Sequence, residues 1–226
     1  MTEDVVDFPE IVEIPIFPLP NVVLFPRTLL PLHIFEPRYK QMIGNALEGN
    51  RQIGIVLLQP GWEGGHQGNL EVFDTGGAGV ISEYKSLEKG QYHILVNGSH
   101  RFRIMDFIQE EPYRVARVQV LKDVLPSDRE ANEIATELAL RFTELNMKSL
   151  ASEMNLDLLE QLDFPTLVNS ICSSLSLSVY DKQKLLELDN VKSRAQMILD
   201  VLRQQVSRGR FVSQFSYLKP EDPRVN

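Results

Sequence analysis

The chain has 226 residues, of which 43% are hydrophobic, so it is long enough to bury a core of its own. Its formal net charge of -8 produces a field that repels nucleic acid. The single cysteine, Cys172, excludes an internal disulfide framework and a multi-cysteine zinc site, and it suits a reducing compartment. Apolar runs are too short to span a bilayer, and the acidic N-terminal segment lacks the pattern of a secretory signal. We therefore expect a cytoplasmic protein with no membrane contact.

The first part of the chain, residues 12–125, is predicted to be rich in strands. Residues 53–58 form a continuous apolar run, typical of a strand buried on both faces, and residues 113–121 alternate between polar and apolar. Residues 79–85 and 91–96 read as two strands joined by a turn at 86–90. Asn97-Gly98 predicts a tight hairpin that leads into a third strand at 101–104. A closed or nearly closed barrel would remove the exposed edges of these strands.

One helix is expected within this part. Pro37 stands at a first helical position, and Gly49 is a candidate C-terminal cap. Apolar residues follow Pro37 at helical spacing, which predicts a stripe that packs on the sheet: Tyr39, Met42, Ile43, Ala46 and Leu47.

Helical patterns dominate residues 126–208. Ser127 and Glu130 have the spacing of a capping box before a helix that reaches about residue 147. Shorter helices are expected at 156–162, 166–175 and 181–188, and a last long helix is expected to follow Asn190 and to end at Gly209. Residues 1–11 and 210–226 read as terminal arms. Because strands and helices are segregated, the predicted class is α+β, with a barrel at 12–125 and a helical bundle at 126–208.

The motifs of common catalytic sites are absent. The sequence contains no Gly-Lys dipeptide for a phosphate-binding loop and no Gly-x-Ser-x-Gly nucleophile elbow. The four histidines form no metal-binding motif with acidic neighbours. We therefore expect no enzymatic activity, no cofactor and no bound metal.

A proline-rich apolar segment near the N-terminus resembles the start of the Lon N-terminal domain family. The matching residues are Pro18, Leu19, Val23, Phe25, Pro26, Pro31 and Leu32. The likeness continues through 79–81, 95–104, 181–187 and 191–194, and it covers roughly residues 12–207. The stretch 35–39 looks most like stand-alone bacterial members of this family and like the Lon-domain part of RING-containing ligases.

The resemblance implies a six-stranded, PUA-like barrel with one inserted helix, followed by a helical bundle. In full-length Lon this region recognises unfolded or tagged substrates, ahead of an ATPase and a peptidase domain. For this chain the resemblance implies a non-catalytic module without those two domains. It would bind unfolded or exposed polypeptide segments or a partner protein.

Four residues are candidates for that binding surface, and each has an alternative role. Trp62 lies in a glycine-rich stretch and is either an anchor for a partner or a lid over the core. Glu36 and Arg38 form either a cap with a local ion pair or a polar rim. Arg101 is the fourth candidate. Together with Arg103, Arg114 and Arg117 it would also serve an alternative RNA-binding face, although the same alternation is typical of a half-buried strand.

Overall fold

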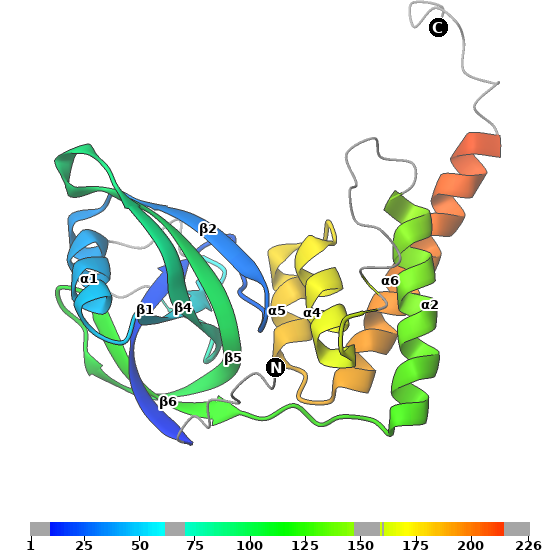
Figure 1. Ribbon diagram of the computed structural model, residues 1–226, viewed down its shortest axis with the longest axis horizontal. Helices are drawn as coiled ribbons and strands as arrows, with labels where there is room; N and C mark the ends of the chain where they lie inside the picture. The colour runs from blue at the N-terminus through cyan, green and yellow to red at the C-terminus, as the bar shows by residue number, and fades with distance from the viewer. Residues whose placement is uncertain (1–9, 62–70, 147–158, 160, 215–226) are drawn as a thin grey trace, which may run out of the picture. The chain divides into compact units, whose positions relative to one another are not determined.

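The computed structural model describes residues 10–61, 71–146, 159 and 161–214 (Figure 1). Its residues group into two compact units. The barrel unit comprises Met1–Val124 and Cys172–Asp189, and the helical unit comprises Leu125–Ile171 and Asn190–Asn226.

The barrel unit contains one six-stranded sheet in the order β2-β5-β4-β3-β1-β6. A further pairing between β5 and β6 joins the sheet into a near-closed ring. The strands are β1 (Ile11–Leu19), β2 (Leu29–Ile34), β3 (Gln52–Leu57), β4 (Thr75–Ser86), β5 (Tyr92–Gln109) and β6 (Arg114–Leu121). Only β1 and β3 pair in parallel. The predicted α+β class is therefore confirmed. The last five residues of β3 are all buried, as its apolar run predicts.

The predicted hairpin at Asn97-Gly98 is wrong. Both residues lie inside β5, which continues for 18 residues and contacts β4 along most of its length. Gly98 is needed there for a different reason: a Cβ atom at this position would lie 2.2 Å from the carbonyl oxygen of Phe25. The glycine thus permits a close approach between two chain segments, a role that glycine in a strand often has. The turn expected at 86–90 is present, with positive φ angles at Lys89 and Gly90.

Two groups of apolar side chains fill the barrel unit. One contains Ile14, Ile16, Val56 and Phe102 together with Ala116 and Val118. The other joins residues of β3, β4 and β5 to the helix α1 (Pro37–Glu48), which contributes Tyr39, Met42, Ile43 and Ala46. The predicted stripe of α1 therefore packs on the sheet. Gly49 ends the helix at a negative φ angle, so it does not form a left-handed cap.

The helix α5 (Val179–Glu187) belongs to the barrel unit although it follows the helical segment in sequence. The amide of the buried Gln183 donates to the carbonyl oxygen of Thr75 on β4 at 2.9 Å. Residues 172–189 therefore group with the strands, whereas the sequence assigned them to the bundle at 126–208. This difference arises because the contact is made between residues more than one hundred positions apart, which no local pattern records.

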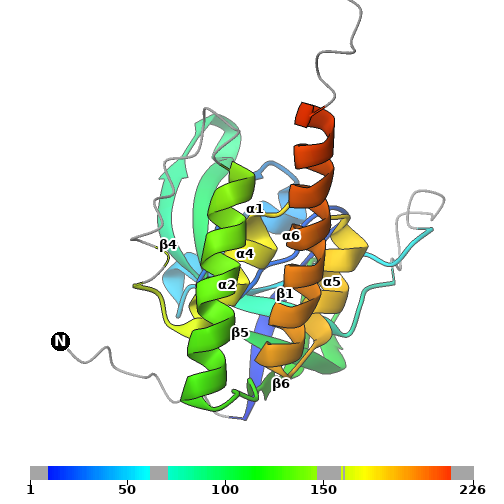
Figure 2. The same ribbon diagram turned by 90° about the vertical axis from the view of Figure 1, so that its right-hand side faces the viewer.

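The helical unit is organised around α2 (Asp128–Asn146) and α6 (Val191–Gln214), which run side by side (Figure 2). The predicted capping box of α2 is present, since Ser127 and Glu130 exchange backbone-to-side-chain hydrogen bonds. The side chain of Asn190 accepts from the Ser193 amide at 3.0 Å at the start of α6. The apolar face of α6 is buried as predicted: Val191, Ala195, Ile198, Leu199, Leu202 and Val206.

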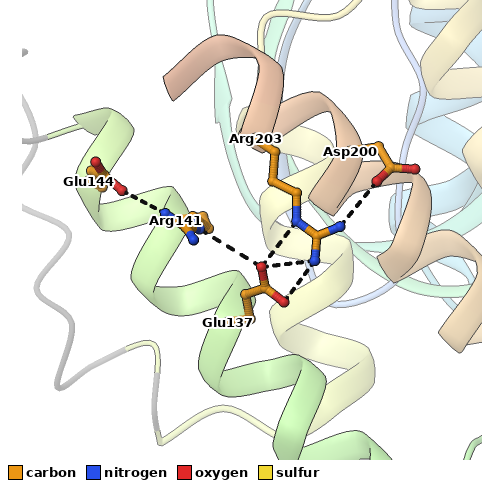
Figure 3. A network of polar contacts seen from close by, with 5 residues as sticks. All are labelled: Glu137, Arg141, Glu144, Asp200 and Arg203. Carbon is orange, nitrogen blue, oxygen red and sulfur yellow. Dashed lines mark hydrogen bonds and ion pairs between the residues drawn. The ribbon is translucent and has the colours of Figure 1, made fainter. Parts of the chain in front are cut away.

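Polar contacts on the surface also join α2 to α6. Arg203 of α6 holds both carboxylate oxygens of Glu137 of α2 at 2.9 Å, and Asp200 and Arg141 extend the network (Figure 3). A bidentate pair of this kind fixes the relative position of two side chains better than a single contact does. The remaining described helix, α4 (Phe164–Ser174), begins within the helical unit.

One expectation for the helices is wrong, and another lies mostly outside the described residues. The last helix continues through Gly209 to Gln214, so Gly209 does not end it. The helix expected at 156–162 lies mostly outside the described residues. Cys172 is fully buried, as expected for a small core residue.

Candidate functional site

An exposed and largely apolar surface is formed by side chains of β2 and by Phe35, the residue directly after it. Leu29 and Phe35 are 60% and 59% exposed, and Pro31 and His33 between them are also exposed. We call these four residues the β2 surface. Covering large apolar side chains of this exposure with a partner is favourable by about 25 cal/mol per Å² of apolar area removed from water.

The position of β2 in the sheet makes this surface accessible from the side. β2 is the terminal strand of the sheet order and pairs with β5 alone, from Leu29 opposite Asn97 to Ile34 opposite Tyr92. Among the described residues no strand pairs with its other side (Figure 1). The edge therefore carries backbone groups that are free to meet a further chain.

Two histidines lie opposite each other on the exposed face of β2 and β5. His33 lies directly opposite His93, and their rings meet edge to face with centroids 4.9 Å apart. A ring nitrogen of His33, Nε2, is 3.0 Å from the Oε1 atom of Gln91. The rings of His33 and Phe35 are also in contact, with centroids 5.8 Å apart. His33 and His93 therefore form a cross-strand aromatic pair, and His33 also contacts Gln91.

Glu36 and Arg38 form an ion pair at the end of this surface, where α1 begins. The Arg38 Nη2 atom is 3.0 Å from Glu36 Oε2, and both side chains remain about half exposed. Glu36 makes no side-chain cap hydrogen bond, so of the two local roles expected for it only the ion pair is present. The Arg38 guanidinium also lies 4.6 Å from the ring centroid of Tyr39. Burial raises the pKa of Tyr39, although the nearby Arg38 cation opposes that shift.

Arg101 does not lie on an accessible face. Its side chain is 1% exposed, and its guanidinium contacts the carboxylates of Asp123 at 2.8 Å and Asp189 at 3.0 Å. The same group donates to the carbonyl oxygens of Leu186 and Lys122. A buried cation needs such partners because its desolvation is costly. The expectation that Arg101 contacts a partner is therefore corrected: within the barrel unit it joins β5 to the end of α5.

The other three arginines do not form a uniform cationic face with it. Arg117 is neutralised by Asp106 at 3.3 Å and Glu13 at 3.7 Å. Arg114 lies over the ring of Phe107, 5.2 Å from its centroid, and Arg103 is exposed. The geometry therefore matches the ordinary polar face of a strand rather than a row of guanidinium groups aimed at phosphates.

The remaining candidate, Trp62, lies outside the described residues. Described residues near both ends of the stretch 62–70 contribute to the lining of a cavity of about 270 Å³. Its lining is mostly polar: Gln59, Glu71, Val72, Asp74, Phe107, Glu110 and Arg114.

Sequence reasoning missed Leu29 and Phe35 as surface residues. A usable signal was Pro31, because proline within a strand favours an edge position. Residues 29–35 are almost continuously apolar, so which of them face water depends on the fold around them. Among the described residues no group of three acidic, histidine or cysteine side chains is placed to hold a metal ion. None of the described helices has the length and apolar character needed to cross a membrane.

Comparison with known proteins extends the resemblance seen in the sequence. A model of the ATP-dependent protease La (LON) substrate-binding domain matches residues 13–204. The Lon protease of Cytophaga hutchinsonii is 28% identical over 206 residues, covering 88% of this chain and 25% of the relative. The Lon protease of Roseiflexus castenholzii is 30% identical over 207 residues, covering 90% of this chain and 25% of the relative. The chain thus spans about a quarter of the length of these relatives.

Solved structures support the fold. The N-terminal domain of the Mycobacterium avium complex Lon protease superposes with a TM-score of 0.67 at 16% identity, over 87% of this chain and 98% of that one. A Lon N-terminal domain protein from Xanthomonas campestris gives a TM-score of 0.60 at 21% identity, over 84% and 98% of the two chains. Since the family model covers most of the sequence, this chain belongs to the Lon substrate-binding domain family.

Proposed function

We propose that this chain is a non-catalytic module that binds exposed segments of unfolded polypeptides or of a partner protein. The observation that carries the proposal is the family match over residues 13–204, which is to a substrate-binding domain and to no catalytic one. The β2 surface supports it, because exposed Leu29 and Phe35 beside a polar rim of Glu36 and Arg38 are the composition of a protein-binding site.

We further infer that the module works in the cytoplasm without a cofactor, an inference that the lone buried cysteine supports. Trp62 stays a proposed contact for the bound polypeptide. Nucleic acid is not proposed as a ligand, since Arg101 is buried and Arg117 is paired with two carboxylates.

Salt dependence separates protein binding from nucleic-acid binding. We expect casein to bind with micromolar affinity and to lose little affinity as salt rises, because contacts between apolar groups are hardly screened. Binding to phosphates would release counterions and weaken steeply with salt. Fluorescence anisotropy with labelled casein and with a labelled single-stranded RNA, each across a salt series, measures both. Tight RNA binding with a steep salt slope would contradict the proposal.

Variants of the β2 surface locate the contact. Phe35→Ser should weaken casein binding by on the order of 2 kcal/mol, the effect of removing an aromatic anchor. Met105→Ser is the matched control, because Met105 is also about half exposed. It lies in the later part of β5, beyond the residues 92–97 that pair with β2. Equal losses from both substitutions would show that the β2 surface is not the contact. Unchanged binding by Trp62→Ala would remove Trp62 from the proposal.

A further inference from the structure

The outer edge of β2 has a definite set of hydrogen-bonding groups. The Gly98 amide donates to the Thr28 carbonyl oxygen at 2.9 Å, which directs Thr28 toward β5. Backbone groups in an antiparallel pair point to alternate sides. The antiparallel register then directs the backbone groups of Leu30, Leu32 and Ile34 toward β5.

Leu29, Pro31 and His33 consequently direct their backbone groups away from β5. Leu29 and His33 each present an N–H and a carbonyl oxygen at the outer edge, and Pro31 presents a carbonyl oxygen only. No hydrogen bond joins these groups to another of the described residues. An extended chain is the ligand that satisfies such a row of donors and acceptors.

A second free edge in the same unit is protected, whereas that of β2 is not. β3 pairs with β4 only as far as Val80, so the end of β4 has β5 on one side alone. That end carries the exposed charged residues Glu83 and Lys85, a common device against strand pairing. Between Leu29 and Ile34 there is no charged residue.

We propose that β2 binds an extended polypeptide segment as an added strand along its outer edge. This inference rests on the proposed function and specifies how the polypeptide is held. The segment should alternate apolar and polar residues, because Leu30 and Leu32 on the inner face are only partly buried against the core. Apolar side chains of the added strand would cover them, while those on the opposite face would lie beside Leu29 and His33.

Pro31 disfavours a second copy of this chain as the added strand. A two-fold axis through Pro31 would place two prolines opposite each other, and neither could donate to the carbonyl oxygen of the other. An unrelated segment with an N–H at that position leaves no such gap. Pro31 therefore limits self-association of the edge and still permits peptide binding.

Proline substitutions at the edge test the backbone contacts separately from the side chains. Leu29→Pro and His33→Pro each remove one outward N–H, and the fold should accept them because these amides do not pair with β5. Leu29→Ala and His33→Ala are matched controls that keep the N–H. The probe is a capped, fluorescent peptide of alternating valine and threonine with a lysine at each end. We expect each proline variant to bind it about tenfold more weakly than its alanine control.

N-methylated peptides make the same test on the unaltered protein. Methylation of every second amide removes the donors on one side of the peptide strand only. One of the two methylated series should lose binding by about tenfold or more, and the other should bind nearly as well as the parent. Equal effects of the two series, or proline variants that bind like their alanine controls, would overturn strand addition.

The outcomes also distinguish this inference from the proposed function. If the unaltered protein binds casein and all edge variants bind it equally, strand addition fails and polypeptide binding stands. If the unaltered protein binds neither casein nor the peptide, the proposed function fails. A dimer of the unaltered protein in sedimentation that is lost in His33→Pro would assign the edge to a second copy and overturn the peptide as its occupant.

Discussion

Arg101 makes several buried polar contacts within the barrel unit. Replacing it with methionine keeps much of the volume but removes its contacts with Asp123, Asp189 and the buried Leu186 carbonyl. Breaking a buried ion pair costs about 3–5 kcal/mol, and the partial exposure of both aspartates lowers that figure. We expect Arg101→Met to lower the free energy of unfolding by about 2–3 kcal/mol in urea titrations.

Arg103 supplies the control for that substitution. It lies two residues further along β5 and its side chain is exposed. Arg103→Met should change the free energy of unfolding by less than about 0.5 kcal/mol. Equal stability of Arg101→Met and the unaltered chain would show that the buried contacts contribute nothing net.

His100 makes the stability depend on pH. Burial lowers the pKa of this side chain below its ordinary value of 6.5. Because the unfolded chain binds the proton more readily, this contribution to stability is present above pH 6.5 and is lost as the pH falls toward the folded pKa. We expect the urea concentration at the unfolding midpoint to decrease as the pH is lowered from 7.5 to 5.5. The decrease should be smaller in His100→Gln. Identical pH profiles of the two proteins would contradict this.

At the scale of single elements, α5 depends on its N-terminal cap. The Ser178 hydroxyl accepts from the Asp181 amide at 3.1 Å and donates to the Asp181 carboxylate at 2.6 Å. These contacts, with Lys184, lower the pKa of Asp181. Ser178→Ala should lower the free energy of unfolding by about 1 kcal/mol, whereas Ser178→Asn, which can also cap, should stay within a few tenths. Faster hydrogen exchange of the Asp181 amide in Ser178→Ala alone would verify the cause.

At the scale of the whole molecule, we propose that the division at residues 125 and 126 separates two structurally distinct parts, but that the first part needs residues 172–189. A fragment 1–125 keeps the strands and lacks Gln183 and Asp189, which contact Thr75 and Arg101. We expect a β-type circular dichroism spectrum and a lower urea midpoint than that of the barrel in the full chain. Adding the fragment 126–226 should raise the midpoint again. A mainly helical spectrum of the fragment 1–125 would contradict the division.

The sequence by itself determined the elements whose signals are local. The capping residues Ser127 and Asn190 contact backbone amides within a few positions, so their spacing was sufficient to place helix starts. The α+β class followed from the segregation of strand and helix periods, and the family followed from an ordered set of motifs.

Only the tertiary structure decided what depends on distant residues. Asn97-Gly98 has the composition of a hairpin turn, yet the approach of Phe25 and the continuous pairing with β4 keep it in a strand. Arg101 alternates like a surface residue and is buried by Asp123 and by Asp189, 88 positions away. The free edge of β2 exists because the ring closes through β5 and β6 and leaves β2 outside. Strand order and burial arise from contacts across the whole chain, which local patterns do not encode.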